Sequence, residues 1–166
     1  MDSGIHKVLM KKAGAFLARR AHSLADLRRR LAPFGSHEQV DFALGHLERL
    51  NLLNDSDYAY NFALRRIRRL GWSSAKVRTA LLGHQVASSI IDLALDRVRS
   101  ESGGEDLVIR EYLLKRYGKG GLPADVKGVR RLIMHLRRRG FEEENIISAL
   151  KGEIPDAALR RFETGE

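Results

Sequence analysis

The stretch RRLIMHLRRRGFEEENIISAL, residues 130–150, contains the pattern that decides the fold. In its first half, apolar residues recur every three or four positions, which predicts an amphipathic helix. This helix ends in three consecutive arginines and a Gly-Phe pair, and a second apolar segment follows three acidic residues. We therefore expect two helices joined by a glycine-containing turn, with the acids at the start of the second helix.

The apolar part of this pattern occurs three times along the chain. The segments VDFAL (40–44), IDLAL (91–95) and IISAL (146–150) can be aligned, and each follows two other apolar helical segments. The copies are spaced by about 50 residues, and a unit of this size is marginal as an independent domain. Stacking of such units supplies the missing burial, as in solenoids. The sequence thus predicts an all-α protein of three tandem three-helix repeats that form an elongated, curved rod.

The expected repeat boundaries follow from this alignment. The repeats are predicted at 1–53, 54–100 and 105–153, with a tail at 154–166 that forms one short helix and frays. RSESGGED (99–106) is the expected flexible joint between the second and third repeats. GKGGLPAD (118–125) is expected to be a loop inside the third repeat, with Pro123 opening the next helix.

Helical spacing also predicts helix caps and the core. Ser23, paired with Asp26, is an expected N-cap, as is Ser36, which forms a capping box with Gln39. Asn54 or Asp55 is the expected cap of the next long helix. The predicted inward-facing residues are Leu24, Leu27, Leu31, Val40, Ala43, Leu44, Leu47, Ala59, Phe62, Ala63, Ile67, Leu70, Val77, Leu81, Ile90, Ile91, Ala94, Leu95 and Val98, with Tyr58, Tyr112, Tyr117 and Phe141 in the repeat cores.

Composition limits the class of protein. The chain of 166 residues has 43% hydrophobic and 31% charged residues, and its 30 Lys and Arg against 21 Asp and Glu give a net charge of +9. Such a charge attracts polyanions or acidic protein surfaces. There is no cysteine, so disulfides and thiolate nucleophiles are excluded. No apolar run is long enough for a signal peptide or a spanning helix. These features predict a soluble, cytoplasmic protein without a membrane partner.

The arginines form one cluster in each predicted repeat. Like charges at helical spacing repel, so helix stability alone does not call for them. A solvated surface or the helix dipole explains any single cluster, but their recurrence favours binding of carboxylate or phosphate groups. Trp72 could stack on a base or fill an interface pocket, although packing between two helices is the simpler interpretation, and Tyr58 is a secondary candidate. The candidate residues are Arg28, Arg29, Arg30, Arg65, Arg68, Arg69, Trp72, Arg131, Arg137, Arg138 and Arg139.

Motifs of catalysis and of metal binding are absent from the sequence. The six histidines are scattered, and Asp55 and Asp57 lie at a helix start, where capping explains them. GKGG lacks the remainder of a phosphate-binding loop. We therefore expect no enzyme activity, no cofactor and no metal. One alternative is a free-standing basic DNA-binding protein of helix-turn-helix type, since short helix pairs joined by glycine turns resemble that motif.

Several segments together resemble one bacterial family. LADLRRRL (24–31), LLNDSDYAYNF (52–62), RRIRRLGWSSAKVRTAL (65–81), YLLKRYG (112–118) and DVKGVRRLIMHLRRRGF (125–141) are similar to motifs of the RecX family, regulators of the RecA recombinase. The resemblance spans most of the chain. Asn54 stands where an acid is common in the family, and Gln85 stands where glycine is frequent.

The resemblance implies a non-enzymatic regulator built of tandem three-helix repeats. Such proteins lie along the groove of the RecA–single-stranded-DNA filament and suppress ATP hydrolysis, filament extension and strand exchange. The implied partners are the RecA filament and single-stranded DNA, with weak, nonspecific duplex binding. Whether the chain acts by capping the filament or by blocking its groove is left open by the sequence.

Overall fold

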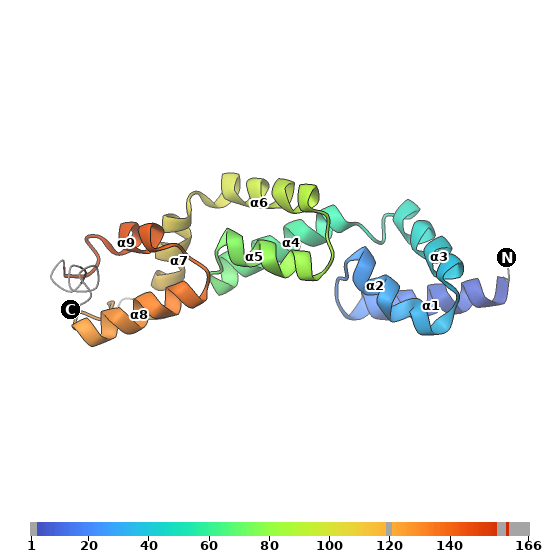
Figure 1. Cartoon of the computed structure of the whole chain (residues 1–166), viewed down its shortest axis with the longest axis horizontal. Coiled ribbons are helices and arrows are strands. Elements are labelled where there is room, and N and C mark those ends of the chain that lie inside the picture. Colours follow the sequence, from blue (N-terminus) through green and yellow to red (C-terminus); the bar gives the residue numbers. More distant parts are fainter. Residues whose placement is uncertain (1–2, 119–120, 156–158, 160–166) are drawn as a thin grey trace. The chain divides into compact units, whose positions relative to one another are not determined.

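The computed structural model describes residues 3–118, 121–155 and 159, and regular structure in this part of the chain is helical (Figure 1). Apart from one isolated bridge between Lys151 and Ile154, the described residues contain no β-structure. This confirms the predicted all-α fold of tandem three-helix repeats. The helices are α1 (Ser3–Arg19), α2 (Leu24–Leu31), α3 (His37–Arg49), α4 (Asp55–Leu70), α5 (Ser74–Gly83), α6 (Ser88–Ser102), α7 (Glu105–Tyr117), α8 (Val126–Arg138) and α9 (Glu143–Leu150), with a 3₁₀ turn, η1 (Ala32–Phe34), after α2.

Contacts within the chain divide it into two compact units. The first unit comprises Met1–Phe62 and Ala80–Ala94, and the second comprises Ala63–Thr79 and Leu95–Glu166. Helices α4, α5 and α6 therefore each contribute residues to both units. The proposed repeat boundaries stay a prediction, because these two units do not coincide with three separate repeats.

In the first unit, α1, α2 and α3 pack against one another around an apolar core. Helical spacing explains this core, since each helix contributes residues three or four positions apart. Leu24, expected in the core, is only partly buried and packs at its edge. The buried members are Leu9, Ala13, Leu27, Leu31, Val40, Ala43, Leu44, Leu47 and Leu53, which confirms the expected inner faces of α2 and α3.

The predicted caps of α2 and α3 are confirmed. The Asp26 N–H donates to Ser23 Oγ (3.1 Å), and Ser36 forms a reciprocal capping box with Gln39. At α4, Asn54 Oδ1 accepts from two backbone N–H groups of the first turn, at 2.9 and 3.2 Å. Asp55 instead accepts from the Leu24 N–H (2.8 Å). The sequence allows either residue as the cap, and the structure selects Asn54.

A buried polar cluster lies in the first unit. Asp26 on α2 is 5% exposed, and its Oδ2 lies 2.7 Å from His84 Nδ1, just after α5. Ser23 Oγ donates to the His84 carbonyl (2.8 Å), and Arg29 forms an ion pair with Asp26. A buried carboxylate is costly unless it is paired. These partners therefore explain why α2 tolerates an acid on its inner side.

In the second unit, the turn after α4 packs against α7 and against the turn after α8. The Ser73 N–H donates to the Arg139 carbonyl (3.0 Å). Gly71 has a φ of +56°, and a Cβ placed on it would lie 2.5 Å from Tyr112 Cγ. Gly140 has a φ of +90°, and its Cβ would lie 2.5 Å from Ser73 Oγ. Glycine at both positions thus allows a left-handed backbone and a close approach of the two turns.

Most of the predicted core of α4, α5 and α6 is confirmed, with a few differences. Leu70 is 38% exposed because it is the last residue of α4, where the chain turns away at Gly71. Phe62 and Ile90 are only partly buried. Tyr112 and Phe141 are buried as expected, whereas Tyr58 and Tyr117 are partly exposed. Ala59, Ala63, Ile67, Val77, Leu81, Ile91, Ala94, Leu95 and Val98 are buried.

Two expectations about helix boundaries differ from the structure. The joint expected at 99–106 does lie between α6 and α7, but α6 continues to Ser102 and α7 begins at Glu105, so only Gly103 and Gly104 separate the helices. Pro123 does not open α8. Asp125 caps that helix, since its side chain accepts from the Gly128 N–H (2.8 Å). In both cases the helix boundary is set by a capping side chain or by glycine rather than by composition.

In the predicted tail, Ile154 and Leu159 are buried, and the rest of its expected helix falls largely outside the described residues. Gln85 has a φ of +56°, a conformation that glycine adopts more readily than glutamine. Within the described part of the chain, no helix combines the length and apolarity needed to cross a bilayer.

Candidate functional site

The first arginine cluster is engaged in contacts within its own unit. Arg28 Nε lies 2.8 Å from Asp41 Oδ1 on α3, and Arg29 pairs with Asp26. The Arg30 guanidinium lies 5.4 Å from the centre of the Phe16 ring. The Arg28–Asp41 pair is exposed on both sides and contributes little stability. Asp26 is buried, so Arg29 also offsets the cost of its burial. A ligand must therefore compete with existing partners for each of these three arginines.

In the second cluster, one arginine is bonded to the end of α6, and two have no side-chain partner among the described residues. Arg68 donates from Nη2 to the Glu101 carbonyl (2.8 Å) and from Nε to Ser102 Oγ (3.1 Å) at the end of α6. Arg65 and Arg69 are exposed, and no described residue forms a hydrogen bond or ion pair with their guanidinium groups. Helical spacing placed all three on one face but could not separate their roles.

Trp72 lies beside two cations in the second unit. The Arg66 guanidinium and the Lys76 ammonium lie 4.6 and 4.8 Å from the centre of its ring, and the indole is partly buried. Lys76 Nζ also donates to the Arg138 carbonyl (2.6 Å). Cation–π contacts of this kind hold the ring in place. Stacking of a base on Trp72 would require one cation to move.

In the third cluster, two arginines are engaged at the end of α8. Arg137 pairs with Glu143 at the start of α9. Arg139 Nε donates to His135 Nε2 (2.9 Å), and its guanidinium lies 4.3 Å from the centre of the Tyr112 ring. The other two, Arg131 and Arg138, are exposed and have no side-chain hydrogen bond or ion pair with a described residue.

His135 marks a strongly positive environment beside this cluster. Arg139 donates to its Nε2, so this nitrogen is an acceptor and the ring proton lies on Nδ1. Burial lowers the pKa of His135 from its ordinary value of 6.5, and Arg139, Arg116 and Arg138 lower it further. Burial, followed by Arg20 and Arg30, also lowers the pKa of His22 in the first unit. Sequence spacing gave no sign of either effect.

The free energy of unfolding is expected to fall as the pH drops below about 6.5. Unfolded His135 then binds a proton that the folded protein does not bind, and stability is lost until the pH passes the lowered folded pKa. Thermal unfolding at about pH 7.5 and about pH 5.5 measures this loss. In the variant His135→Gln, the difference between the two pH values should be smaller. An identical difference in both proteins would contradict the assignment, since His22 is present in each.

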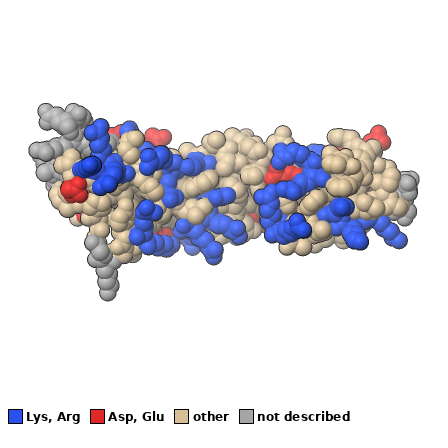
Figure 2. Space-filling view, turned by 90° about the horizontal axis from the view of Figure 1, so that it is seen from below, with Lys and Arg blue, Asp and Glu red and all other residues tan. Residues whose placement is uncertain are grey.

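The surface chemistry agrees with anion binding. Figure 2 shows a face of the molecule on which blue Lys and Arg side chains are prominent and red acids are sparse. Guanidinium groups bind carboxylate and phosphate oxygens through paired hydrogen bonds. Among the described residues, no group of three or more His, Cys, Asp or Glu side chains could hold a metal ion.

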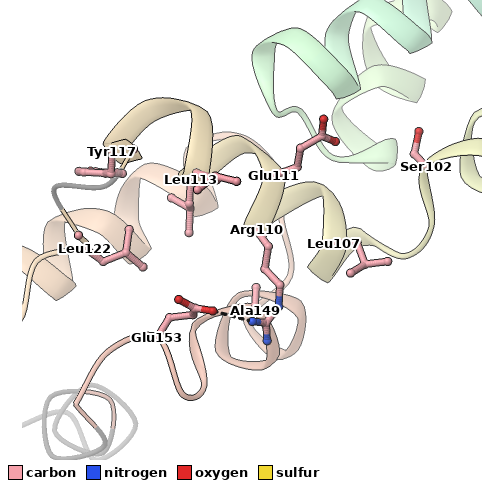
Figure 3. A pocket seen from close by; sticks show the side chains of 12 residues that line it. Ser102, Leu107, Arg110, Glu111, Leu113, Tyr117, Leu122, Ala149 and Glu153 are labelled. Carbon is pink, nitrogen blue, oxygen red and sulfur yellow. Dashed lines mark hydrogen bonds and ion pairs between the residues drawn. The ribbon is translucent and has the colours of Figure 1, made fainter.

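A second kind of surface lies between α7, α9 and the loop at 121–122. It is a groove of about 560 Å³ with leucines along α7, and Figure 3 shows Leu107 and Leu113 near it. Arg110 crosses its edge, where Nη1 lies 3.2 Å from Glu153 Oε1 and Nη2 donates to the Ser148 carbonyl (2.8 Å). The charges at this edge are therefore neutralised within the unit, unlike those of Arg131 and Arg138.

Comparison with known proteins gives a consistent family. Regulatory protein RecX of Chromobacterium violaceum is 33% identical over 152 residues, which cover 90% of this chain and 93% of that protein. RecX of Ralstonia pickettii is 30% identical over 146 residues, 87% of each chain. RecX of Thermus thermophilus is 36% identical over 96 residues, 58% of this chain and 65% of that one. No protein-family model matches.

A solved structure shows the same fold. The crystal structure of a regulatory protein RecX matches with a TM-score of 0.68 at 18% identity, over 90% of this chain and 72% of that chain. Fold and site together define a basic, all-helical repeat protein with exposed arginines suited to anionic groups. The similarity over nearly the whole length then gives the family. The chain belongs to the RecX family of regulatory proteins.

Proposed function

We propose that the chain inhibits the RecA recombinase by binding along the groove of the RecA–single-stranded-DNA filament. Bound there, it suppresses ATP hydrolysis, filament extension and strand exchange. The observation that carries the proposal is family membership at 33% identity over 90% of the chain. The exposed, unpaired arginines Arg65, Arg69, Arg131 and Arg138 support it, because a filament of protein and DNA presents both carboxylates and phosphates. The cytoplasm is the proposed location, since RecA and its DNA are found there.

Repetition of weak contacts explains how such a surface could act. Single exposed arginines contribute modestly to affinity. When one chain contacts several neighbouring filament subunits, each later contact is intramolecular, and the overall affinity rises without any single strong contact. The proposal requires no bond-breaking chemistry and no cofactor from this chain.

The time course of ATP hydrolysis by RecA on single-stranded DNA tests this function. We expect the chain to lower the hydrolysis rate in a concentration-dependent way, and a rate unchanged at equimolar chain and RecA would refute inhibition. Order of addition separates the two mechanisms. Groove binding should inhibit filaments that are already complete in proportion to the amount of chain added. Capping should act at much lower ratios, and only while filaments grow.

A helix-turn-helix DNA-binding protein is the second candidate function. It draws support from helix pairs joined at glycine, such as α4 and α5 at Gly71. Sequence-specific affinity for naked duplex DNA that persists at moderate salt would favour it. Weak, nonspecific duplex binding together with strong effects on RecA filaments would favour the regulator.

A further inference from the structure

A basic pocket lies in the second unit between α7 and α8. Its volume is about 310 Å³, and three guanidinium groups line it, from Arg116 on α7 and from Arg131 and Arg138 on α8. A single acid, Asp125, belongs to its wall. Three cations thus face one carboxylate. The remaining lining residues are Tyr117, Pro123, Gly128, Leu132 and His135.

The pocket is built by packing rather than by chance exposure. The α8 residues in its wall recur at helical spacing, so they lie along one stripe of that helix. Pro123 and Asp125, which precede α8, also belong to the wall, and Asp125 Oδ1 accepts from the Gly128 N–H (2.8 Å). A Cβ on Gly128 would lie 2.6 Å from Pro123 Cβ, so only glycine allows this close approach.

The three arginines line the same pocket, and two of them have no side-chain partner among the described residues. The Arg116 guanidinium lies 5.8 Å from the centre of the Tyr117 ring on α7, and a hydrogen bond with the Tyr117 side chain, followed by the Tyr112 phenol, raises its pKa. Arg131 and Arg138 lack side-chain hydrogen bonds and ion pairs among the described residues. Two of the three cations are therefore available to a ligand, and the third is already oriented.

We propose that this pocket binds one phosphate group of a single-stranded polynucleotide. One carboxylate is satisfied by a single bidentate guanidinium, whereas a phosphate offers oxygens to several guanidinium groups at once. Tyr117 is partly exposed in the wall and offers an aromatic surface beside the phosphate. This inference rests on the proposed contact of the chain with single-stranded DNA and assigns a part of that contact to named residues.

The salt dependence of binding to an oligodeoxythymidylate tests the assignment. For single strands, the slope of log K against log salt concentration changes by about 0.7 for each phosphate contact. The double variant Arg131→Gln/Arg138→Gln should therefore bind more weakly, with a slope less steep by about 0.7. The matched control is Arg130→Gln/Lys151→Gln, which removes two exposed charges of the same unit that do not line the pocket. The control should keep the slope of the unchanged protein.

The His135 ring supplies a second measurement. It is surrounded by Tyr112 and Arg116 from α7 and by Arg138 and Arg139 from the end of α8, with Asp125 in the wall of the same pocket. A phosphate in the pocket adds negative charge beside the ring, so the oligonucleotide should raise the pKa of His135 measured by NMR. Inorganic phosphate alone should raise this pKa in the same direction, and in excess it should leave little further shift for the oligonucleotide to cause.

Several outcomes would overturn the assignment. If the pocket variant and its control reduce the salt-dependence slope equally, the reduction comes from the net charge of the protein and not from the pocket. A His135 pKa that stays constant while the oligonucleotide binds would place the DNA elsewhere. If the pocket variant inhibits RecA poorly but keeps the salt slope, the pocket binds a carboxylate of the partner protein instead.

Failure of the proposed function is distinguishable from failure of the pocket. If the unchanged protein does not slow ATP hydrolysis by RecA, the proposed function is wrong. In that case the pocket assignment still stands on the salt slope and the His135 pKa, because neither measurement includes RecA.

Discussion

Replacement of Gly71 by alanine is expected to destabilise the second unit by about 3 kcal/mol. Alanine adopts the left-handed backbone conformation less readily than glycine, and its added side chain overpacks the site. The new Cβ would lie 2.5 Å from two ring atoms of Tyr112 and 3.0 Å from its Cβ. Tyr112 cannot easily move aside, because it is 8% exposed and its hydroxyl is hydrogen-bonded to His135 (2.9 Å). Both the backbone conformation and the close contact therefore oppose alanine.

Gly152→Ala is the matched control for this prediction. Gly152 also has a positive φ, +82°, and belongs to the second unit, but no atom lies within 4 Å of the position that an added Cβ would take. This variant should show only the conformational cost, about 1–2 kcal/mol. Urea unfolding followed by the fluorescence of Trp72, the single tryptophan, reports on the second unit. Equal losses in the two variants would show that Tyr112 does not restrict the turn.

Reversal of both free arginines of α4, in Arg65→Glu/Arg69→Glu, is expected to raise the concentration needed to inhibit RecA by about tenfold or more. Each reversal removes an attraction to an anionic filament and adds a repulsion. Arg68 stays unchanged in this variant, because its guanidinium bonds Glu101 and Ser102 and its loss would disturb the end of α6. The measurement is the ATP hydrolysis rate of RecA on single-stranded DNA, titrated with each protein.

Lys7→Glu/Lys11→Glu is the control for that reversal, since it makes the same change in net charge at two exposed positions of α1 that are also four residues apart. Its inhibition should stay within about twofold of the unchanged protein. Far-ultraviolet circular dichroism should show the same helix content in all three proteins. If both double variants inhibit equally well, Arg65 and Arg69 are not part of the interface, and the family assignment is unaffected.

Much of the fold could be predicted from local patterns. The caps at Ser23 and Ser36 and the inner faces of α2 and α3 depend on residues three or four positions apart, which are neighbours on any helix. Expectations are wrong where a boundary depends on one capping group, as at Asp125, or where a helix continues through polar residues, as α6 does to Ser102. Local composition is a weak guide at such places.

The candidate site could be predicted only in part. The sequence located the clusters, but Arg28 pairs with Asp41 thirteen positions away and Arg68 bonds residues more than thirty positions away. Arg116 and His135 lie in segments that resemble the family, but they were missed because neither belongs to one of the three arginine clusters. Their role depends on the packing of α7 against α8, which brings both residues into the wall of one pocket. A search for charges near buried aromatic residues could have suggested Arg116.

By itself, the sequence determined the helical fold, its repeats, its basic character and its family, because these depend on spacing and composition along the chain. Tertiary structure decided which arginines are already paired, that Gly71 must accommodate the Tyr112 ring, and that three guanidinium groups share one pocket. The physical reason is distance. Electrostatic and steric interactions act through space over a few ångströms, and packing alone brings residues far apart in the sequence within that range.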